Sequence, residues 1–459
     1  MKLAPEDTIV SIATPVGEGA ISIVRVSGPM AIPFCDGVFV GSVKLADTPG
    51  YTIRHGTIRR EDLSIVDEVL VSVYRAPHSY TGEDSVEISC HGGMLVTAEV
   101  LKAVLKVGAR QAQPGEYSKR AFLNGKIDLS KAEAIASIIS ARTKTALRIS
   151  VEHLEGRLQE KVDAIRADLI DLCSVVELEL DFAGEDVTLL TSTEILHKSS
   201  LVKRSIEELI FAFENGRLLR EGASVVITGS PNVGKSSLFN KLLNTERAIV
   251  SHIPGTTRDL LEENLTLNGI LFRLTDTAGI RESDDIIESQ GVSRARAKET
   301  ASDISIEVID GANERESIDI PKSNGDQRHR IIAINKLDLL DQKVRQKWKA
   351  RTGSKGVLIS AKTGEGLENL TRRLCEVVSD NGIVDSEVTV GATTQRQRDA
   401  LESGLRHIED AQNVCTNNGG SELVAFELRE CLSSISEITG EVTTDEILNR
   451  VFGQFCIGK

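Results

Sequence analysis

The sequence lacks the features of a membrane or secreted protein. No apolar run approaches the roughly 18 residues that a membrane-spanning helix needs. The first residues, MKLAPEDTIV, carry Glu6 and Asp7 where a signal peptide would have positive charge followed by an apolar run. We therefore expect neither secretion nor membrane insertion.

Paired cysteines and a net positive charge are also lacking. The seven cysteines stand singly, without C-x-x-C spacing, which favours a reducing, cytoplasmic location over a disulfide framework or a zinc site. The formal net charge of −14 argues against a protein that coats nucleic acid through its overall field. One locally basic cluster, Lys119, Arg120, Lys126 and Lys131, indicates either solvated side chains beside a helix start or an anion site.

What is present is a chain of 459 residues, long enough for two or three domains. Residues 1–124 contain short β-rich runs and one helix, which predict a small α+β domain. Residues 125–220 have apolar side chains at helical spacing and predict the first part of an α-helical domain.

From residue 221 the pattern changes to strands that alternate with helices. Residues 221–382 are therefore expected to form a mostly parallel, doubly wound α/β sheet. Helical sequence returns in residues 383–455, before a short tail at 456–459. The simplest arrangement inserts the α/β domain into a helical domain. Glu307 makes one strand unusually polar, so we expect it at a sheet edge or paired with a cation.

The segment GSPNVGKSS, Gly229 to Ser237, matches G-x-x-x-x-G-K-[ST] between a strand and a helix. Its glycines let the backbone wrap a phosphate with N–H groups pointing inward, and the helix N-terminus adds partial positive charge. Lys235 is expected to reach the β- and γ-phosphates, and the Ser236 hydroxyl to bind Mg²⁺.

Base recognition is predicted by two motifs that follow later strands. NKLD, Asn335 to Asp338, places a carboxylate that can accept hydrogen bonds from both guanine N1–H and the 2-amino group. Adenine lacks this donor pair, so the carboxylate would stay unpaired against it. SAK, Ser360 to Lys362, would close over the base.

Two further motifs complete a GTPase pattern. In DTAGI, Asp276 to Ile280, the Asp276 carboxylate would hold Mg²⁺ through the ion's coordination shell, and the Gly279 N–H would contact the γ-phosphate. PGTTRD supplies Thr257 as the switch threonine on Mg²⁺. Motifs in this order at strand ends indicate a P-loop GTPase domain of the Ras-like type.

The group that would act on the attacking water is not identified by these motifs. Ras-like GTPases carry a glutamine after DTAG, but here that position is Ile280, which cannot orient water. The stretch RESDDIIE offers Glu282, Asp284, Asp285 and Glu288, and a carboxylate could act through a bridging water. The alternative is a solvated acidic loop.

These motifs, together with TGED and HGG near the N-terminus, AFLNGKIDLSKAEAI and the terminal CIGK, resemble the MnmE (TrmE) family of tRNA-modification GTPases over the whole chain. The resemblance implies K⁺-dependent GTP hydrolysis coupled to modification at C5 of the tRNA wobble uridine. It implies a heterotetramer with an FAD-containing MnmG (GidA) partner and a homodimer formed through the N-terminal domain. It also implies a bound tetrahydrofolate derivative, 5-formyl- or 5,10-methylene-tetrahydrofolate, as the one-carbon carrier.

The resemblance further assigns roles to residues. It makes Lys235, Thr257 and Glu288 catalytic, with Glu288 favoured over Glu282. A K⁺ ion would supply the charge that an arginine finger gives elsewhere. Its expected ligands are Asn232, Ser251, Ile253 and Thr256, those of Mg²⁺ are Ser236 and Thr257, and the folate contacts are Arg25, Glu87, Lys126 and Lys459.

The residues expected to contact GTP share the motif positions of the P-loop, the switch and the base pocket. They are Asn232, Val233, Gly234, Lys235, Ser236, Ser237, Ser251, His252, Ile253, Pro254, Gly255, Thr256, Thr257, Asp276, Thr277, Ala278, Gly279, Asn335, Lys336, Asp338, Ser360, Ala361 and Lys362.

The alternative function is a ribosome-assembly or translation GTPase that acts as a switch without modification chemistry. Its G motifs would look the same, but it would have no need of a one-carbon carrier. A third possibility, prenylation at Cys456, fits poorly because Gly458 and Lys459 do not make an a-a-X ending. The resemblance instead directs the tail toward the folate pocket, where Cys456 is either a reactive thiol or a buried apolar residue.

Overall fold

The computed structural model describes residues 7–181, 191–245, 262–276, 302–313, 329–353, 356–378, 393–417, 419–453, 455 and 457–458. The chain divides into two compact units. The first unit consists of Met1–Ala136, His153–Val202 and Ser403–Lys459, and the second of Ser137–Glu152 and Lys203–Glu402.

A seven-stranded sheet in the order β3-β4-β5-β6-β2-β1-β7 dominates the N-terminal part of the first unit. All described pairings are antiparallel except the short parallel pair of β1 and β7. The strands are β1 (Ile9–Ile12), β2 (Ile21–Ser27), β3 (Phe39–Gly41), β4 (Thr52–Arg59), β5 (Ile65–Tyr74), β6 (Ser85–His91) and β7 (Arg110–Gln111).

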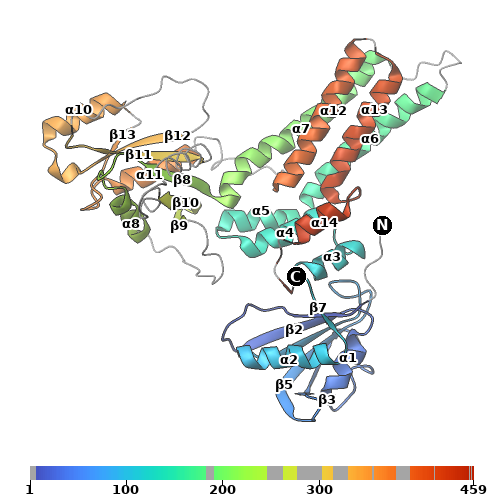
Figure 1. The fold of residues 1–459 in the computed structure, drawn as a ribbon. Helices are drawn as coiled ribbons and strands as arrows, with labels where there is room; N and C mark the ends of the chain where they lie inside the picture. Colours follow the sequence, from blue (N-terminus) through green and yellow to red (C-terminus); the bar gives the residue numbers. More distant parts are fainter. Residues whose placement is uncertain are drawn as a thin grey trace, which may run out of the picture. The chain divides into compact units, whose positions relative to one another are not determined.

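Helices α1 (Ala31–Val38) and α2 (Met94–Lys106) pack on one face of this sheet (Figure 1). Alternate strand residues such as Val24 and Ile88 are fully buried against these helices. Because successive side chains of a strand point to opposite faces, Arg25 and Glu87 lie on the other face, where they are partly exposed.

The C-terminal helix packs close to the start of the helical region. α3 (Glu116–Leu123), α4 (Leu129–Ser140) and α14 (Asp445–Phe452) share an apolar cluster that includes Phe122, Leu129 and Phe452. Gly115, which precedes α3, has a φ of +68°, and a Cβ there would lie 2.2 Å from the Phe452 carbonyl oxygen. The chain therefore requires glycine at this approach.

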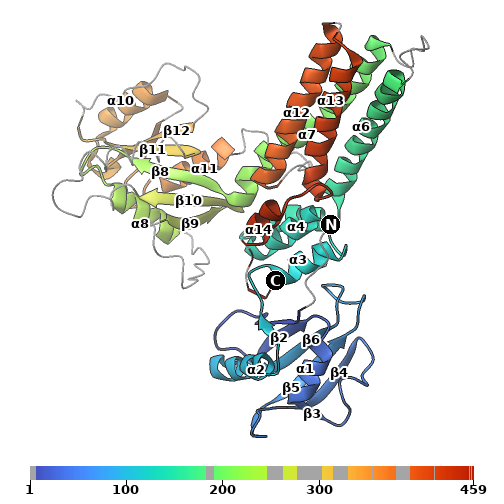
Figure 2. The ribbon, with the colours of Figure 1, turned by 45° about the vertical axis from the view of Figure 1, so that its right-hand side comes forward.

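Helices from before and after the α/β segment lie side by side in the first unit. α6 (Arg157–Asp181) runs along α13 (Ser421–Thr439), as Figure 2 shows. Arg166 of α6 donates a 3.0 Å hydrogen bond to the Ser436 hydroxyl of α13. The remaining helices of the helical segments are α5 (Lys144–Leu154), most of which belongs to the second unit, and α7 (Ser192–Glu221) and α12 (Gln395–Thr416), which are divided between the two units. None of the described helices combines the length and the apolar character that a bilayer crossing requires.

The second unit contains a six-stranded sheet in the order β13-β12-β11-β8-β10-β9. Every pairing is parallel except that of β9 with β10. The strands are β8 (Ala223–Thr228), β9 (Glu262–Leu267), β10 (Ile270–Asp276), β11 (Ile304–Asp310), β12 (His329–Asn335) and β13 (Gly356–Leu358).

Both faces of this sheet are buried. On β12, Ile331 and Ala333 join a cluster that contains residues of α8 (Lys235–Thr245) and α11 (Leu367–Val378). The alternate residues Ile332 and Ile334 join a cluster with Trp348 of α10 (Gln342–Thr352). This burial explains the continuous apolar strands. The fold classes predicted from the sequence, an α+β domain, an α-helical domain and a doubly wound α/β domain, are confirmed.

Candidate functional site

The P-loop lies between β8, which ends at Thr228, and α8, which begins at Lys235. A Cβ on Gly229 would lie 2.2 Å from the Val308 carbonyl oxygen, and a Cβ on Gly234 would lie 2.3 Å from Asn335 Nδ2. Both glycines also have positive φ, +138° and +97°. These positions therefore require glycine, and the loop backbone is free to surround a phosphate.

The polar side chains of the loop are placed for anion and cation contacts. Lys235 Nζ donates to the carbonyl oxygens of Gly229 and Ser230 at 3.0 and 2.9 Å, so its ammonium group stays with the loop. Asn232 adopts a φ of +63° and is exposed, and Ser236 is exposed in the first turn of α8. Hydroxyl and amide oxygens of this kind suit Mg²⁺ and K⁺ as hard ligands.

Asn335 joins three of the predicted motifs. Its side chain, 3% exposed, donates from Nδ2 to the Val233 carbonyl at 2.7 Å and accepts at Oδ1 from the Ala361 N–H at 2.9 Å. The P-loop, the NKLD segment and the SAK segment are therefore fixed to one another through a single buried amide.

Asp338 lies in a short 3₁₀ helix, Leu337–Leu339, beside the SAK segment. Its Oδ1 accepts a 2.6 Å hydrogen bond from the Ser360 hydroxyl, and this bond lowers the pKa of the Asp338 carboxyl. Lys336, with a φ of +66°, pairs with Asp310 at 2.6 Å. A lowered pKa keeps the Asp338 carboxyl ionised, and an ionised carboxylate acts only as a hydrogen-bond acceptor.

Asp276 is the last residue of β10 and is paired in register with Ile227 of β8, so the DTAGI motif starts at the P-loop end of the sheet. The other expected residues of the switch segments lie outside the described part of the chain, as do those of the tail. They are Ser251, His252, Ile253, Pro254, Gly255, Thr256, Thr257, Thr277, Ala278, Gly279, Glu288, Cys456 and Lys459.

A second candidate site lies on the face of the N-terminal sheet opposite α1 and α2, where Arg25 and Glu87 are partly exposed. Arg25 and Glu87 stand opposite each other on β2 and β6, and Arg25 Nε and Nη2 contact Glu87 Oε1 at 2.9 and 2.8 Å. Arg25 Nη1 donates to the carbonyl oxygen of Gly458 at 3.4 Å, so the C-terminal tail reaches this pair. Lys126 donates to the Pro77 carbonyl at 3.1 Å, in the segment between β5 and β6.

No motif of the sequence points to the tyrosines around Arg25. The rings of Tyr80 and Tyr117 lie 5.7 Å from the Arg25 Cζ. Burial and the nearby charge of Glu87 raise the pKa of Tyr74, whose ring packs edge-on against that of Tyr51 with centroids 5.6 Å apart. The chain has four tyrosines, Tyr51, Tyr74, Tyr80 and Tyr117, and Tyr80 and Tyr117 are those whose rings face Arg25. Their confinement to the first 117 residues was the one available signal.

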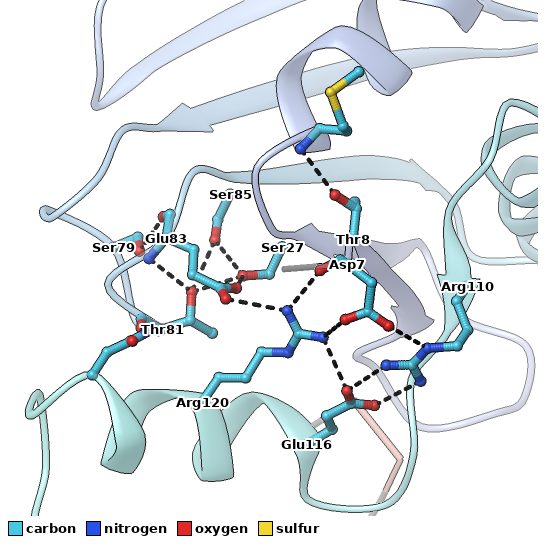
Figure 3. A network of polar contacts seen from close by, with 12 residues as sticks. Asp7, Thr8, Ser27, Ser79, Thr81, Glu83, Ser85, Arg110, Glu116 and Arg120 are labelled. Atoms are coloured by element: carbon cyan, nitrogen blue, oxygen red, sulfur yellow. Dashed lines mark hydrogen bonds and ion pairs between the residues drawn. The ribbon is translucent and has the colours of Figure 1, made fainter. Parts of the chain in front are cut away.

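Helix α3, which carries Tyr117, is held by a network of ion pairs that we name the Arg120 network: Asp7, Glu83, Arg110, Glu116 and Arg120 (Figure 3). Arg120 is 1% exposed and pairs with Asp7, Glu83 and Glu116 at 2.6, 3.1 and 3.0 Å. Arg110 pairs with Asp7 and Glu116 at 2.7 and 2.6 Å. The network ties α3 and β7 to the start of β1.

This network corrects the expectation for the basic cluster. Arg120 is neither solvated nor available to an anion, because three carboxylates already surround it. Burial alone would raise the pKa of Glu116, but hydrogen bonds from Arg110, the Gln113 N–H and Arg120 outweigh it and lower that pKa. A single sequence cannot show this, since the partners come from four separate segments.

The cysteines of the described residues are buried thiols. Six are free and buried, and burial raises the pKa of Cys173 to about 11 and that of Cys431 to about 12. Thiolate chemistry at these positions is therefore suppressed. Within the described part of the chain, no three His, Cys, Asp or Glu side chains gather in a way that could hold a metal ion.

Comparison with known proteins gives matches along the chain. A family model described as MnmE helical domain matches residues 129–456, and one described as GTP-binding protein TrmE N-terminus matches residues 8–126. The tRNA modification GTPase MnmE of Carboxydothermus hydrogenoformans is 43% identical over 99% of this chain and 100% of its own. That of Chlorobaculum tepidum is 40% identical over 99% of this chain and 98% of its own. The solved G domain of FeoB from Methanococcus jannaschii matches 34% of this chain and 98% of its own, at 23% identity and a TM-score of 0.25.

Proposed function

Since the chain belongs to the MnmE family of tRNA modification GTPases, we propose that its GTP hydrolysis depends on K⁺ and drives modification at C5 of the tRNA wobble uridine. An FAD-containing MnmG-like protein is the proposed partner, in a heterotetramer. The observation that carries the proposal is that one chain contains two sets of positioned polar groups. In the first, Asn335 joins the P-loop to the NKLD and SAK segments. In the second, the Arg25–Glu87 pair is hydrogen-bonded to the C-terminal tail.

In the proposed nucleotide site, the P-loop N–H groups and the start of α8 bind the phosphates. Lys235 reaches the β- and γ-phosphates, and Asp338 accepts from guanine. Ser236 and Thr257 hold Mg²⁺, with Asp276 acting through its shell. When bound, Mg²⁺ neutralises charge on the phosphate oxygens.

The proposed K⁺ ligands are Asn232 together with Ser251, Ile253 and Thr256. The exposed amide of Asn232 in the loop supports its part in this set. When bound, K⁺ supplies the positive charge that an arginine finger gives in other GTPases. Glu288 is proposed to orient the attacking water through a bridging water, in place of the missing glutamine.

In the proposed carrier site, Arg25, Glu87, Lys126 and Lys459 contact a tetrahydrofolate derivative, 5-formyl- or 5,10-methylene-tetrahydrofolate. A carboxylate suits the amino and N–H donors of a pterin ring, and cations suit the carboxylates of a glutamate tail. The Arg25–Glu87 pair presents both kinds of group side by side on a partly exposed part of the sheet face, which supports this assignment.

We also propose that the N-terminal domain, residues 1–124, forms the homodimer contact, and that residues 125–220 and 383–455 form one helical domain around a G domain at 221–382. With a formal net charge of −14, the chain leaves most of the electrostatic attraction for tRNA to its partner.

Calorimetric titration of the full-length chain with 5-formyltetrahydrofolate tests this function. The wild type should bind, and Glu87→Ala should weaken binding by about 10²-fold, because Arg25 and the pterin donors lose their acceptor. Glu68→Ala, which removes an exposed carboxylate paired with His55 on the same sheet, is the matched control and should bind normally. If the wild type binds no carrier while it hydrolyses GTP, the chain is a switch without modification chemistry.

A further inference from the structure

We infer that Tyr80 and Tyr117 are positioning residues that hold the Arg25 guanidinium where it docks the C-terminal tail at Gly458 and faces the carrier. The part that concerns the carrier rests on the proposed function. The part that concerns the tail rests on contacts of the described residues alone.

Tyr117 fixes Arg25 at two points. Its side chain, on α3, is fully buried, and its hydroxyl donates a 2.7 Å hydrogen bond to the Arg25 carbonyl oxygen. The same hydroxyl accepts a hydrogen bond from the Ser11 hydroxyl at 3.3 Å, and its ring lies 5.7 Å from the Arg25 Cζ. Burial raises the pKa of Tyr117, so the hydroxyl stays a neutral donor.

Tyr80 supplies a second ring from a different segment. Its ring also lies 5.7 Å from the Arg25 Cζ, and its hydroxyl is hydrogen-bonded to the Ser118 hydroxyl of α3 at 2.8 Å. Both rings are therefore anchored on the helix that the Arg120 network holds in place. An aromatic face attracts a guanidinium group and restricts its orientation.

The guanidinium contacts that remain are divided between the sheet and the tail. Arg25 Nε and Nη2 contact the Glu87 carboxylate, and Arg25 Nη1 donates a hydrogen bond to the Gly458 carbonyl oxygen. Because a guanidinium carries five N–H donors, this arrangement leaves donors for a ligand. Arg25 can thus hold the tail and meet an anionic or carbonyl group of the carrier at the same time.

Gly458 shows that the tail is closely fitted to the N-terminal sheet. It has a φ of +99°, and a Cβ there would lie 2.4 Å from the Ile12 carbonyl oxygen and 3.0 Å from the Ala13 Cα. Only glycine allows this approach to the end of β1. The hydrogen bond from Arg25 lies at the same residue, so loss of the Arg25 position should release the tail.

Carboxypeptidase B, which removes a C-terminal lysine, provides a direct readout of docking. The bond that it cleaves contains the Gly458 carbonyl, the group that Arg25 binds. Mass spectrometry of the full-length chain would measure the rate of Lys459 removal. Arg25→Ala, Tyr80→Leu and Tyr117→Leu should each increase this rate about five- to tenfold, in line with a partly desolvated cation–π contact.

Conservative and control variants separate positioning from a general structural role. Tyr80→Phe keeps the ring, so Lys459 should be removed from it at nearly the wild-type rate. Tyr117→Phe loses the hydrogen bond to Arg25, so its rate of Lys459 removal should lie between those of the wild type and Tyr117→Leu. Tyr51→Leu removes an exposed tyrosine of the same domain with no contact to Arg25 among the described interactions, and should change nothing. If Tyr117→Leu fails to fold, Tyr80→Leu, in a partly exposed segment, decides the test.

The affinity for 5-formyltetrahydrofolate gives a second, independent readout. Both leucine variants should bind the carrier more weakly, and Tyr80→Phe should restore binding. Trimming of Tyr80→Leu at the wild-type rate would overturn the inference, whatever the carrier does. Faster trimming of Tyr80→Leu with no carrier binding by the wild type would support the role in tail docking and overturn the proposed carrier function.

Discussion

The Ser360 hydroxyl donates a 2.6 Å hydrogen bond to Asp338 Oδ1, although the two residues follow different strands of the second sheet. Ser360 also accepts from the Thr363 N–H at 3.1 Å, so the hydroxyl is fixed from both sides. The carboxylate assigned to guanine is thus oriented before any nucleotide binds. Orientation of this kind reduces the ordering cost of binding.

Asp338→Asn should weaken GTP binding by about 10²-fold, because an amide offers no second acceptor and leaves guanine donors unpaired. It should at the same time improve binding of XTP, whose base has a carbonyl at C2 that the amide can donate to. Calorimetry with both nucleotides measures the exchange. Glu368→Gln, an exposed change in the first turn of α11, is the control and should bind GTP normally. Unchanged GTP affinity in Asp338→Asn would remove this residue from base recognition.

Asn335→Ala should lower the free energy of unfolding of the second unit by about 2–4 kcal/mol, since two buried backbone groups lose their partners. These groups are the Val233 carbonyl and the Ala361 N–H. Asn335→Asp keeps the acceptor for Ala361 but loses the donor to Val233, and should retain part of the stability. Denaturant unfolding followed by the fluorescence of Trp348, which packs in this unit, measures both variants. A loss below about 0.5 kcal/mol would contradict the joining role.

GTP hydrolysis should be faster in K⁺ than in Na⁺ by about 10²-fold or more, because the arginine finger that K⁺ replaces is worth about 10³–10⁵. Asn232→Ala should abolish this preference while GTP still binds. Steady-state phosphate release in matched chloride salts measures the ratio. Equal rates of the wild type in the two salts would refute the K⁺ site and the part assigned to Asn232.

The Arg120 network predicts a loss of stability at low pH. The pKa values of Asp7 and Glu116 are lowered in the folded chain: burial acts against this, but hydrogen bonds from Arg110 and Arg120 prevail. A carboxyl group whose pKa is lowered by folding stabilises the fold at pH values above its unfolded-state pKa of about 4. This stabilisation is lost as the pH falls through the pKa of the folded state. The thermal unfolding temperature of the N-terminal domain should therefore be nearly constant from neutral pH to about pH 5 and should fall below pH 5.

Glu116→Gln is the variant that tests this network. It should cost about 1–3 kcal/mol at neutral pH, because two arginines lose a charged acceptor, and it should flatten the decline at low pH. Glu61→Gln, which affects only an exposed pair with Lys106, is the control. A decline in Glu116→Gln as steep as in the wild type would place the acid sensitivity elsewhere.

The P-loop, NKLD and SAK segments follow strands as the sequence predicted, because each motif has a mechanism that fixes its place at a strand end. The switch segments lie outside the described residues, so their roles stay predictions. The sequence did not predict which side chains pair across neighbouring strands. Glu307 was expected at an edge or with a cation: β11 is a central strand, so the edge is wrong, and the pairing with Arg330 at 2.5 Å is confirmed. The burial of Arg120 and the gathering of the tyrosines around Arg25 depend on which segments the fold brings together, which no local pattern records.

The central claim is that this GTPase serves modification of the wobble uridine, and the nucleosides of tRNA test it most directly. Mass spectrometry should compare tRNA from a strain without this gene, and from the same strain carrying the wild-type gene or its Lys235→Ala variant. The account predicts that the C5 aminomethyl-type uridines disappear on deletion and return with the wild type but not with Lys235→Ala. Unchanged levels of these nucleosides in the deletion strain would contradict it.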